Sequence, residues 1–339
     1  VNLTENDMPQ SACVKCNRCD GYPCVLTAKG DGEAMGIRPA LAAGGSRMSL
    51  LTRSMVKQLK TDASGRRIAS VLVERDGEQL EFSADLVVVS CGAANSAKLL
   101  LMSANDQHPH GLANSSDQVG RNYMFHYSKA VVAVTHEPNP TVFQKTPALN
   151  DWYFGDAEFD FPMGHVQLTG KTNGAMMKGY KPRLTALAPS WSMDKIAAHS
   201  MDFWLQTEDL PLPQNRVTVD GQGQITLDYT ATNVRASAEL QHRLESVLDK
   251  NYGVHHFAER EIYFGSAMGI EAVGHQAGTC RFGDDPRTSV LDVNCKAHDL
   301  DNLYVVDTSF MPSISAVNPS LTAIANAIRV SEHLIERLS

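Results

Sequence analysis

A continuous apolar run that ends in small residues and leads into a helical pattern restricts the fold of this chain most. Residues 85–90 read DLVVVS, which is typical of a strand buried on both faces. Residues 91–93 form a Cys-Gly-Ala turn, and residues 95–104, NSAKLLLMSA, predict a helix capped by Asn95 or Ser96. Ligands bind at the carboxyl ends of such strands in open α/β sheets, so this turn is a candidate binding site.

The C-terminal part repeats this order of elements. Residues 299–307, DLDNLYVVD, predict a second buried strand, and residues 318–338 predict a helix with Pro319 in its first turn. Upstream, two alternating runs meet at Asp76 and Gly77, which are typical residues of a tight β-hairpin turn. These segments predict the α/β fold class, with part of a Rossmann-like domain.

Residues 130–265 differ from the rest of the chain in composition and in hydrophobic pattern. They hold all three tryptophans, many short β-like runs and a turn at Asp220 and Gly221, followed by a predicted helix over residues 237–250. This pattern predicts a mostly antiparallel second domain and an α+β organisation overall. The expected divisions are a loop-rich lead-in at 1–45, α/β segments at 46–129 and 266–339, and the antiparallel domain at 130–265.

The bulk composition excludes some classes of function. The net charge is 30 − 38 = −8, which argues against a nucleic-acid partner because phosphate binding needs a basic face. No apolar run approaches the roughly 20 residues of a membrane helix. The sequence opens on Val1 with no initiator methionine, so we expect a missing upstream segment, and the first residues show no signal-peptide pattern. Localisation stays open between the cytoplasm and the periplasm.

The glycines do not form a dinucleotide-binding fingerprint. Gly30, Gly32 and Gly36 have three residues before the last glycine instead of two, and the preceding VLTAK does not predict a strand. Gly-x-Gly-x-x-Gly occurs nowhere in the sequence. The sequence therefore offers no glycine turn of the kind that cradles a dinucleotide pyrophosphate in a βαβ unit.

Four of the seven cysteines, Cys13, Cys16, Cys19 and Cys24, lie close together with spacings of two, two and four residues. Thiolates at such spacings can hold a zinc ion or part of an iron–sulfur cluster. Free thiols or a disulfide are the alternative, and the sequence leaves both open. The other three cysteines lie in strand or turn contexts typical of small core residues.

Several motifs occur in a fixed order along the chain. Residues 275–279 read HQAGT, residues 302–307 read NLYVVD, and residues 318–322 read NPSLT. Residues 90–104 and 111–126 supply two further segments upstream. Together these motifs resemble the glucose–methanol–choline (GMC) oxidoreductase family, and the resemblance spans nearly the whole chain.

The resemblance implies an FAD-dependent enzyme that oxidises a CH–OH group of a sugar or other alcohol. His275 matches the family's catalytic histidine and Asn318 its second catalytic position, a pairing similar to the pyranose- and sterol-oxidising branches. Chemistry agrees, because a neutral imidazole can take the hydroxyl proton near pH 7 while the flavin accepts the hydride. Asn318 can orient the same oxygen through its amide. His126, which ends its motif, is interpreted as structural.

The resemblance also implies the residues that contact FAD. The implied set is Val56, Cys91, Gly92, Ala93, Asn95, Asp307, Thr308, Asn318, Pro319 and Thr322. Asp307 would lie near the ribityl–pyrophosphate region, although a loop cap is an alternative role. The cysteine segment resembles a lid-like loop that carries an iron–sulfur cluster in some dehydrogenase branches.

Substrate identity and the electron acceptor, which could be O2, a quinone or a protein, stay open at this point. A non-redox flavin lyase or isomerase on the same scaffold and a cofactor-free sugar-binding module are the alternatives. With the glycine-rich unit missing, we expect the chain to be inactive alone.

Overall fold

The computed structural model describes residues 12–17, 19, 24–135, 137–180, 188–252, 263–270 and 273–339. It divides into two compact units. The first comprises Val1–Thr52, Ser128–Gln206 and Ala236–Met268, and the second Arg53–Tyr127, Thr207–Arg235 and Gly269–Ser339. Each unit is described by itself.

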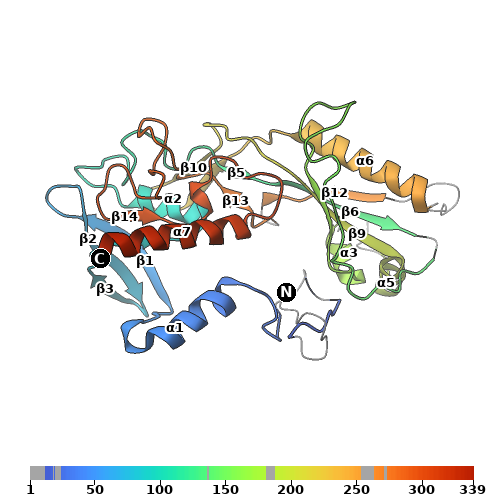
Figure 1. Ribbon diagram of the computed structural model, residues 1–339, viewed down its shortest axis with the longest axis horizontal. Coiled ribbons are helices and arrows are strands. Elements are labelled where there is room, and N and C mark those ends of the chain that lie inside the picture. Colours follow the sequence, from blue (N-terminus) through green and yellow to red (C-terminus); the bar gives the residue numbers. More distant parts are fainter. Residues whose placement is uncertain are drawn as a thin grey trace. The chain divides into compact units, whose positions relative to one another are not determined.

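A three-stranded antiparallel sheet opens the second unit (Figure 1). It consists of β1 (Ser54–Thr61), β2 (Ile68–Arg75) and β3 (Glu78–Phe82), in that order. Asp76 and Gly77 join β2 to β3 with φ values of 53° and 86°, the left-handed pair that a tight hairpin turn needs. The predicted hairpin is confirmed.

A parallel pair of strands forms the Rossmann-like part of the same unit. β4 (Val87–Val89) pairs with β14 (Leu303–Val305), and α2 (Ala93–Met102) follows β4 as the sequence predicts. All three residues of β14 are fully buried. Val88 of β4 is 46% exposed, so the expectation that residues 85–90 are buried on both faces is wrong for this strand. One face of β4 is open to solvent.

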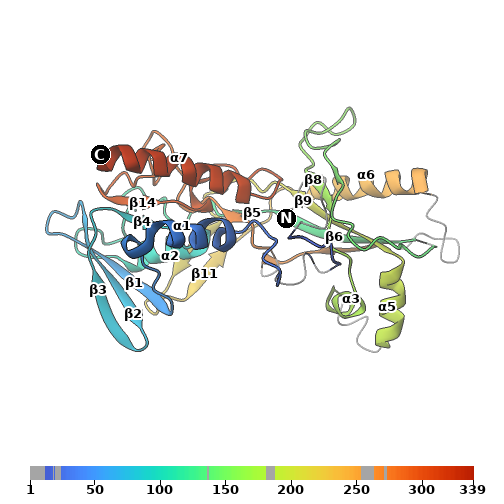
Figure 2. The same ribbon diagram turned by 60° about the horizontal axis from the view of Figure 1, so that its bottom comes forward.

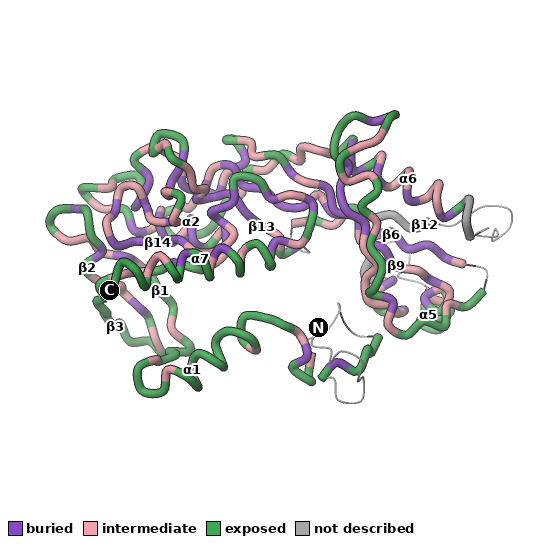
Figure 3. The backbone as a smooth tube through the Cα atoms, viewed as in Figure 1, coloured by how far each residue is buried: buried purple, intermediate pink, exposed green. Residues whose placement is uncertain are grey.

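The C-terminal helix α7 (Ser320–Leu338) has one face packed and one face open. Tyr304 of β14 holds it, because the Tyr304 hydroxyl lies 3.2 Å from His333 Nε2 and accepts from Arg337 Nη1 at 2.7 Å. Figure 3 shows exposed residues recurring along this helix. Its large exposed apolar side chains are Leu321, Ile324, Ile328, Ile335 and Leu338.

The remaining strands of the second unit are short pairs. β5 (Met124–Phe125) pairs with β13 (Gln276–Ala277), and β10 (Arg216–Val219) pairs with β11 (Ile225–Asp228), both antiparallel. The connection from β10 to β11 is longer than the predicted Asp220-Gly221 turn. Asp220 Oδ1 accepts from the backbone N–H groups of Gln222 and Gln224, and the positive φ falls at Gly223.

A five-stranded sheet organises the first unit, with strand order β12-β6-β9-β8-β7. Its strands are β6 (Tyr127–Val134), β7 (Ala148–Leu149), β8 (His165–Leu168), β9 (Ser200–Thr207) and β12 (Tyr263–Ala267). The pairings of β6 with β12, β7 with β8, and β8 with β9 are antiparallel, as the sequence predicts.

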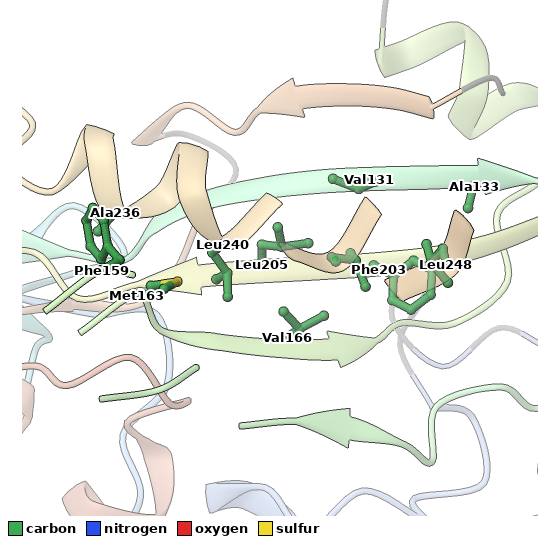
Figure 4. Close-up of a cluster of buried hydrophobic side chains, with 11 residues drawn as sticks. Val131, Ala133, Phe159, Met163, Val166, Phe203, Leu205, Ala236, Leu240 and Leu248 are labelled. Atoms are coloured by element: carbon green, nitrogen blue, oxygen red, sulfur yellow. The ribbon is translucent and has the colours of Figure 1, made fainter. Parts of the chain in front are cut away.

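Helices pack on both faces of this sheet. Val131 and Ala133 of β6 share a core with α6 (Val234–Tyr252), whose Leu240 and Leu248 point toward the sheet in Figure 4. Val132 of the same strand packs instead with α3 (Gly174–Tyr180) and α5 (Ser190–Ala198). Alternate residues of a strand point to opposite faces, which explains the continuous apolar sequence of β6.

The lead-in is more helical than expected. A π-helical turn (Glu33–Ile37) continues into α1 (Arg38–Gly44), which Figure 2 shows as a dark-blue helix. The expectation of a loop-rich segment over residues 1–45 is therefore wrong for 33–44. Alanines favour the helix, and Arg38 Nη2 donates to Glu33 Oε1 at 2.7 Å. Within the described residues, none of the helices combines the length and apolar character of a membrane span.

Candidate active site

A two-residue ladder brings two histidines together. Gln276 of β13 lies opposite Phe125 of β5, so the residues next to them, His275 and His126, also face each other. Their Nδ1 atoms are 3.0 Å apart, and their rings meet edge to face with centroids 4.9 Å apart. His126 is fully buried and His275 is half-buried. The interpretation of His126 as only structural therefore misses its contact with His275.

Asn318 approaches the other side of the His275 ring. Its Nδ2 lies 3.4 Å from His275 Nε2, so the two residues expected to be catalytic lie side by side. Helix α7 begins at Ser320 with Pro319 as its N-cap residue. Asn318 precedes the cap position, which leaves its side chain at the His275 ring instead of on the helix end.

The contacts of the His275 ring define which nitrogen can act as a base. An amide NH2 only donates, so in this arrangement His275 Nε2 accepts and carries the lone pair. The proton of the neutral ring then sits on Nδ1 and is donated to His126 Nδ1. Burial lowers the pKa of His275 below its ordinary value, which favours the neutral form near pH 7.

The Gly-Thr part of the motif fixes this segment in place. Gly278 has φ +90°, and a side-chain carbon there would lie 2.3 Å from the backbone oxygen of Asn122. Thr279 Oγ1 donates to the backbone oxygen of Ala93 at 2.7 Å. The motif thus joins the segment carrying His275 both to the strand region before His126 and to the start of α2.

Asp307 connects the end of β14 to the start of α2. Its Oδ2 accepts from Gly92 N at 2.9 Å and from Ser96 Oγ at 2.5 Å, and its Oδ1 accepts from Ser309 N at 2.7 Å. Gly92 (φ +81°) is the N-cap residue of α2, and no side chain caps this helix. The expectation that Asn95 or Ser96 caps it is therefore wrong, because Asp307 engages Ser96 and Asn95 lies within the helix.

The other residues implied for FAD binding occupy varied settings in the second unit. Thr308 Oγ1 donates to Gln276 O at 2.6 Å, beside His275. Cys91 is exposed in the turn before α2, so the expectation that it is a small core residue is wrong. Thr322 is exposed in the first turn of α7. Val56 lies in β1 opposite Val73, where a bulge follows it.

These residues fit a large anionic cofactor. The N-terminus of α7 lacks a side-chain cap, so its backbone N–H groups and the positive end of its dipole are left for a ligand, whereas at α2 the Asp307 carboxylate already accepts from Gly92 N. A carbon added at Gly92 would meet no atom within 4 Å, which leaves space at the start of α2. The α7 terminus also follows directly on Asn318, next to the His275 ring.

The cysteine segment shows no metal geometry. Cys13 is buried and its Sγ accepts from Lys15 N at 3.4 Å, whereas Cys16 is exposed. Cys24 Sγ accepts from Ala28 N at 3.4 Å, and this hydrogen bond lowers the pKa of the thiol. Among the residues that the structure describes, no three His, Cys, Asp or Glu side chains gather where they could share a metal ion. The zinc and iron–sulfur alternatives gain no support.

Comparison with protein families agrees with the site. The N-terminal model of the GMC oxidoreductases matches residues 2–128, and the C-terminal model matches residues 211–327. The chain belongs to the GMC oxidoreductase family. The second match contains both His275 and Asn318, and the first contains His126.

Characterised GMC relatives align along most of the chain. The 6'''-hydroxyparomomycin C oxidase of Streptomyces lividus is 29% identical over 97% of this chain and 59% of the relative. The 2-methyl-1,2-propanediol dehydrogenase of Mycolicibacterium austroafricanum is 30% identical over 86% of this chain and 55% of the relative. The chain thus spans well under two thirds of the length of these relatives.

Solved structures share the fold. The pyridoxine 4-oxidase from Mesorbium loti superposes with a TM-score of 0.60 at 20% identity, covering 88% of this chain and 61% of that one. A formate oxidase variant of Aspergillus oryzae, solved to examine the effect of a mutation on FAD modification, gives a TM-score of 0.57 at 15% identity, covering 82% and 59%.

Proposed function

We propose that this chain carries the catalytic residues of an FAD-dependent oxidoreductase that oxidises a CH–OH group of a sugar or other alcohol. The observation that carries the proposal is the His275 ring, which His126 contacts at Nδ1 and Asn318 contacts at Nε2. FAD, when bound, accepts the hydride from the substrate carbon.

His275 acts as the base in this proposal. Its Nε2 lone pair takes the proton of the substrate hydroxyl, and the ring becomes an imidazolium. The Nδ1–H of that cation is donated to His126 Nδ1 at 3.0 Å, so a neutral His126 stabilises the charge. Asn318 holds the substrate oxygen close to Nε2 through its amide.

We further propose that a segment outside this chain completes the FAD site. The exposed apolar side chains of α7 and the open face of β4 need a covering element, because soluble proteins rarely expose large apolar patches. The electron acceptor is proposed to be O2, a quinone or a protein. Both oxidases and dehydrogenases occur among the relatives.

Anaerobic flavin reduction tests the proposal. Full-length enzyme with bound flavin is mixed under argon with a panel of sugars, diols and primary alcohols, and the loss of yellow absorbance is followed. At least one alcohol should bleach the flavin within seconds and yield the matching carbonyl compound. A flavin that no alcohol reduces, or turnover without net oxidation of substrate, would contradict the proposal.

A further inference from the structure

Two consecutive acidic residues, Glu208 and Asp209, follow β9 in the chain and belong to the same unit as His275. Glu208 is half-buried and Asp209 is fully buried. The backbone oxygen of Glu208 accepts from Asn233 Nδ2 at 2.7 Å, which fixes the pair where β9 ends. No motif of the sequence points to either residue.

Glu208 forms hydrogen bonds with the segment that precedes Asn318. Its Oε1 accepts from the backbone N–H of Ser315 at 3.2 Å and from the hydroxyl of Ser313 in a short hydrogen bond. Ser315 has φ +56°, a left-handed conformation that is unfavourable for a residue other than glycine. The segment has no regular secondary structure, so the Glu208 carboxylate, together with the buried side chains of Ile314 and Ala316, anchors it three residues before Asn318.

Asp209 contacts the segment that precedes His126. Its Oδ1 accepts from Thr232 N at 3.2 Å and from the Thr232 hydroxyl in a short hydrogen bond. Its Oδ2 lies 3.5 Å from the backbone N of Phe125, the residue before His126. The Tyr229 ring packs edge to face on Phe125, with centroids 4.9 Å apart, and completes this support.

The two sets of contacts converge on one imidazole. Asn318 and His126 touch opposite nitrogens of His275, and each comes from a segment held by one member of the acidic pair. We propose that Glu208 and Asp209 are positioning residues, Glu208 for Asn318 and Asp209 for His126. The proposal rests on the proposed role of His275 as base. Neither carboxylate is shown in contact with His275 itself.

Steady-state kinetics of the full-length enzyme with bound flavin test the role proposed for Glu208. Glu208→Ala removes the acceptor and should lower kcat by about 10- to 100-fold with KM within about 3-fold, because small misplacements at a reacting centre slow chemistry strongly. Glu208→Gln keeps an acceptor oxygen and should retain kcat within about 3-fold. Asp220→Ala is the matched control, because Asp220 likewise accepts from two loop N–H groups in the same unit.

A second readout is independent of turnover. Histidine-selective NMR follows the titration of His275, with the signal assigned through His275→Gln. Glu208→Ala should raise its midpoint as Asn318→Ala does, because an amide that donates to Nε2 favours the neutral ring. Asp209→Ala should shift the His126 signal instead, and Asp209→Asn should restore it. If Asp209→Ala does not fold, Asp209→Ser takes its place, and an unchanged His126 signal there would overturn the role of Asp209.

Three results would overturn the inference. These are an unchanged kcat and His275 midpoint in Glu208→Ala, a loss in Glu208→Gln as large as in Glu208→Ala, and equal losses in Asp220→Ala. A wild-type enzyme whose flavin no alcohol reduces would instead refute the proposed function. The titration of His275 would still report on Glu208, and the His126 signal on Asp209, in that case.

Discussion

His126 and His275 face each other through their Nδ1 atoms at 3.0 Å, so a proton shared between them can sit on only one of the two at a time. The contact links the chemistry of His275 to a fully buried neighbour that water does not reach. In the proposed mechanism, removal of the proton from the substrate and stabilisation of the resulting cation therefore fall to different residues.

Loss of the base should be the most damaging substitution. We expect His275→Ala to lower the rate of flavin reduction by alcohol by about 10²- to 10⁴-fold while flavin stays bound. Stopped-flow absorbance under argon measures this rate. Asn318→Ala should slow it less, and His110→Ala, at an exposed histidine of the same unit, should leave it unchanged. A normal rate in His275→Ala would remove this residue from the mechanism.

Loss of the second histidine should have a smaller effect. His126→Ala removes the acceptor for the His275 Nδ1–H, so we expect kcat to fall by about 10-fold, the effect of one charge-assisted hydrogen bond of roughly 1.5 kcal/mol. His126→Asn can still accept and should recover part of the rate. Steady-state kinetics compare the two variants. Equal rates in His126→Ala and wild type would show that the contact has no role in catalysis.

The pH dependence follows from the lowered pKa of His275. The base must be neutral, so kcat/KM should rise with pH through a midpoint below the ordinary value of 6.5 and level off near neutrality. Between the lowered pKa of His275 in the folded chain and the ordinary value of 6.5, the imidazole binds a proton more readily in the unfolded chain. Stability therefore falls as pH drops from 6.5 to the lowered pKa. Urea unfolding at several pH values, with His275→Gln as control, measures this loss.

Gly278 should tolerate no side chain. Gly278→Ala combines φ +90° with a contact of 2.3 Å to Asn122 O, so we expect it to destabilise the protein by more than about 2 kcal/mol. Gly221→Ala, with ordinary φ and nothing within 4 Å, should change stability by less than about 0.5 kcal/mol. Urea denaturation followed by circular dichroism compares the two variants. Equal midpoints would refute the steric account.

The open face of α7 predicts how the chain behaves alone. The isolated chain should bind an apolar dye and self-associate, and Ile324→Lys with Ile328→Lys should reduce both effects. Light scattering and dye fluorescence measure them, and Lys substitution of the exposed Thr322 is the control. The same chain mixed with FAD should not bind it stoichiometrically. Tight binding would show that these residues alone complete the flavin site.

Local elements were predictable where local chemistry decides them. The Asp76-Gly77 turn, the helix after the Cys-Gly-Ala turn and the C-terminal helix all follow from turn residues and hydrophobic periodicity. The helix at 33–44 was missed because glycines and a proline interrupt a sequence that alanines still favour. Exposure of Val88 could not be foreseen, because an apolar run reports what a strand prefers and not what covers it.

The site was predictable in part, and the missing part has a physical reason. His275 and Asn318 lie in motifs whose order can be read from the sequence, and the structure places them in contact. The role of His126 depends on pairing between segments about 150 residues apart, and that of Glu208 on a loop more than 100 residues away. Neither pairing leaves a local pattern, so only the folded chain reveals these residues.

The ladder between β5 and β13 is only two residues long, and this makes the active site sensitive to changes in chain length. Side chains alternate across a strand, so a slip of this pairing by one residue would turn the imidazole of His275 away from His126. Many substitutions around the site preserve the register of the β5–β13 pairing, whereas a change in length within the paired segment does not. Variation in this segment among functional homologues should therefore consist of exchanged residues at constant length.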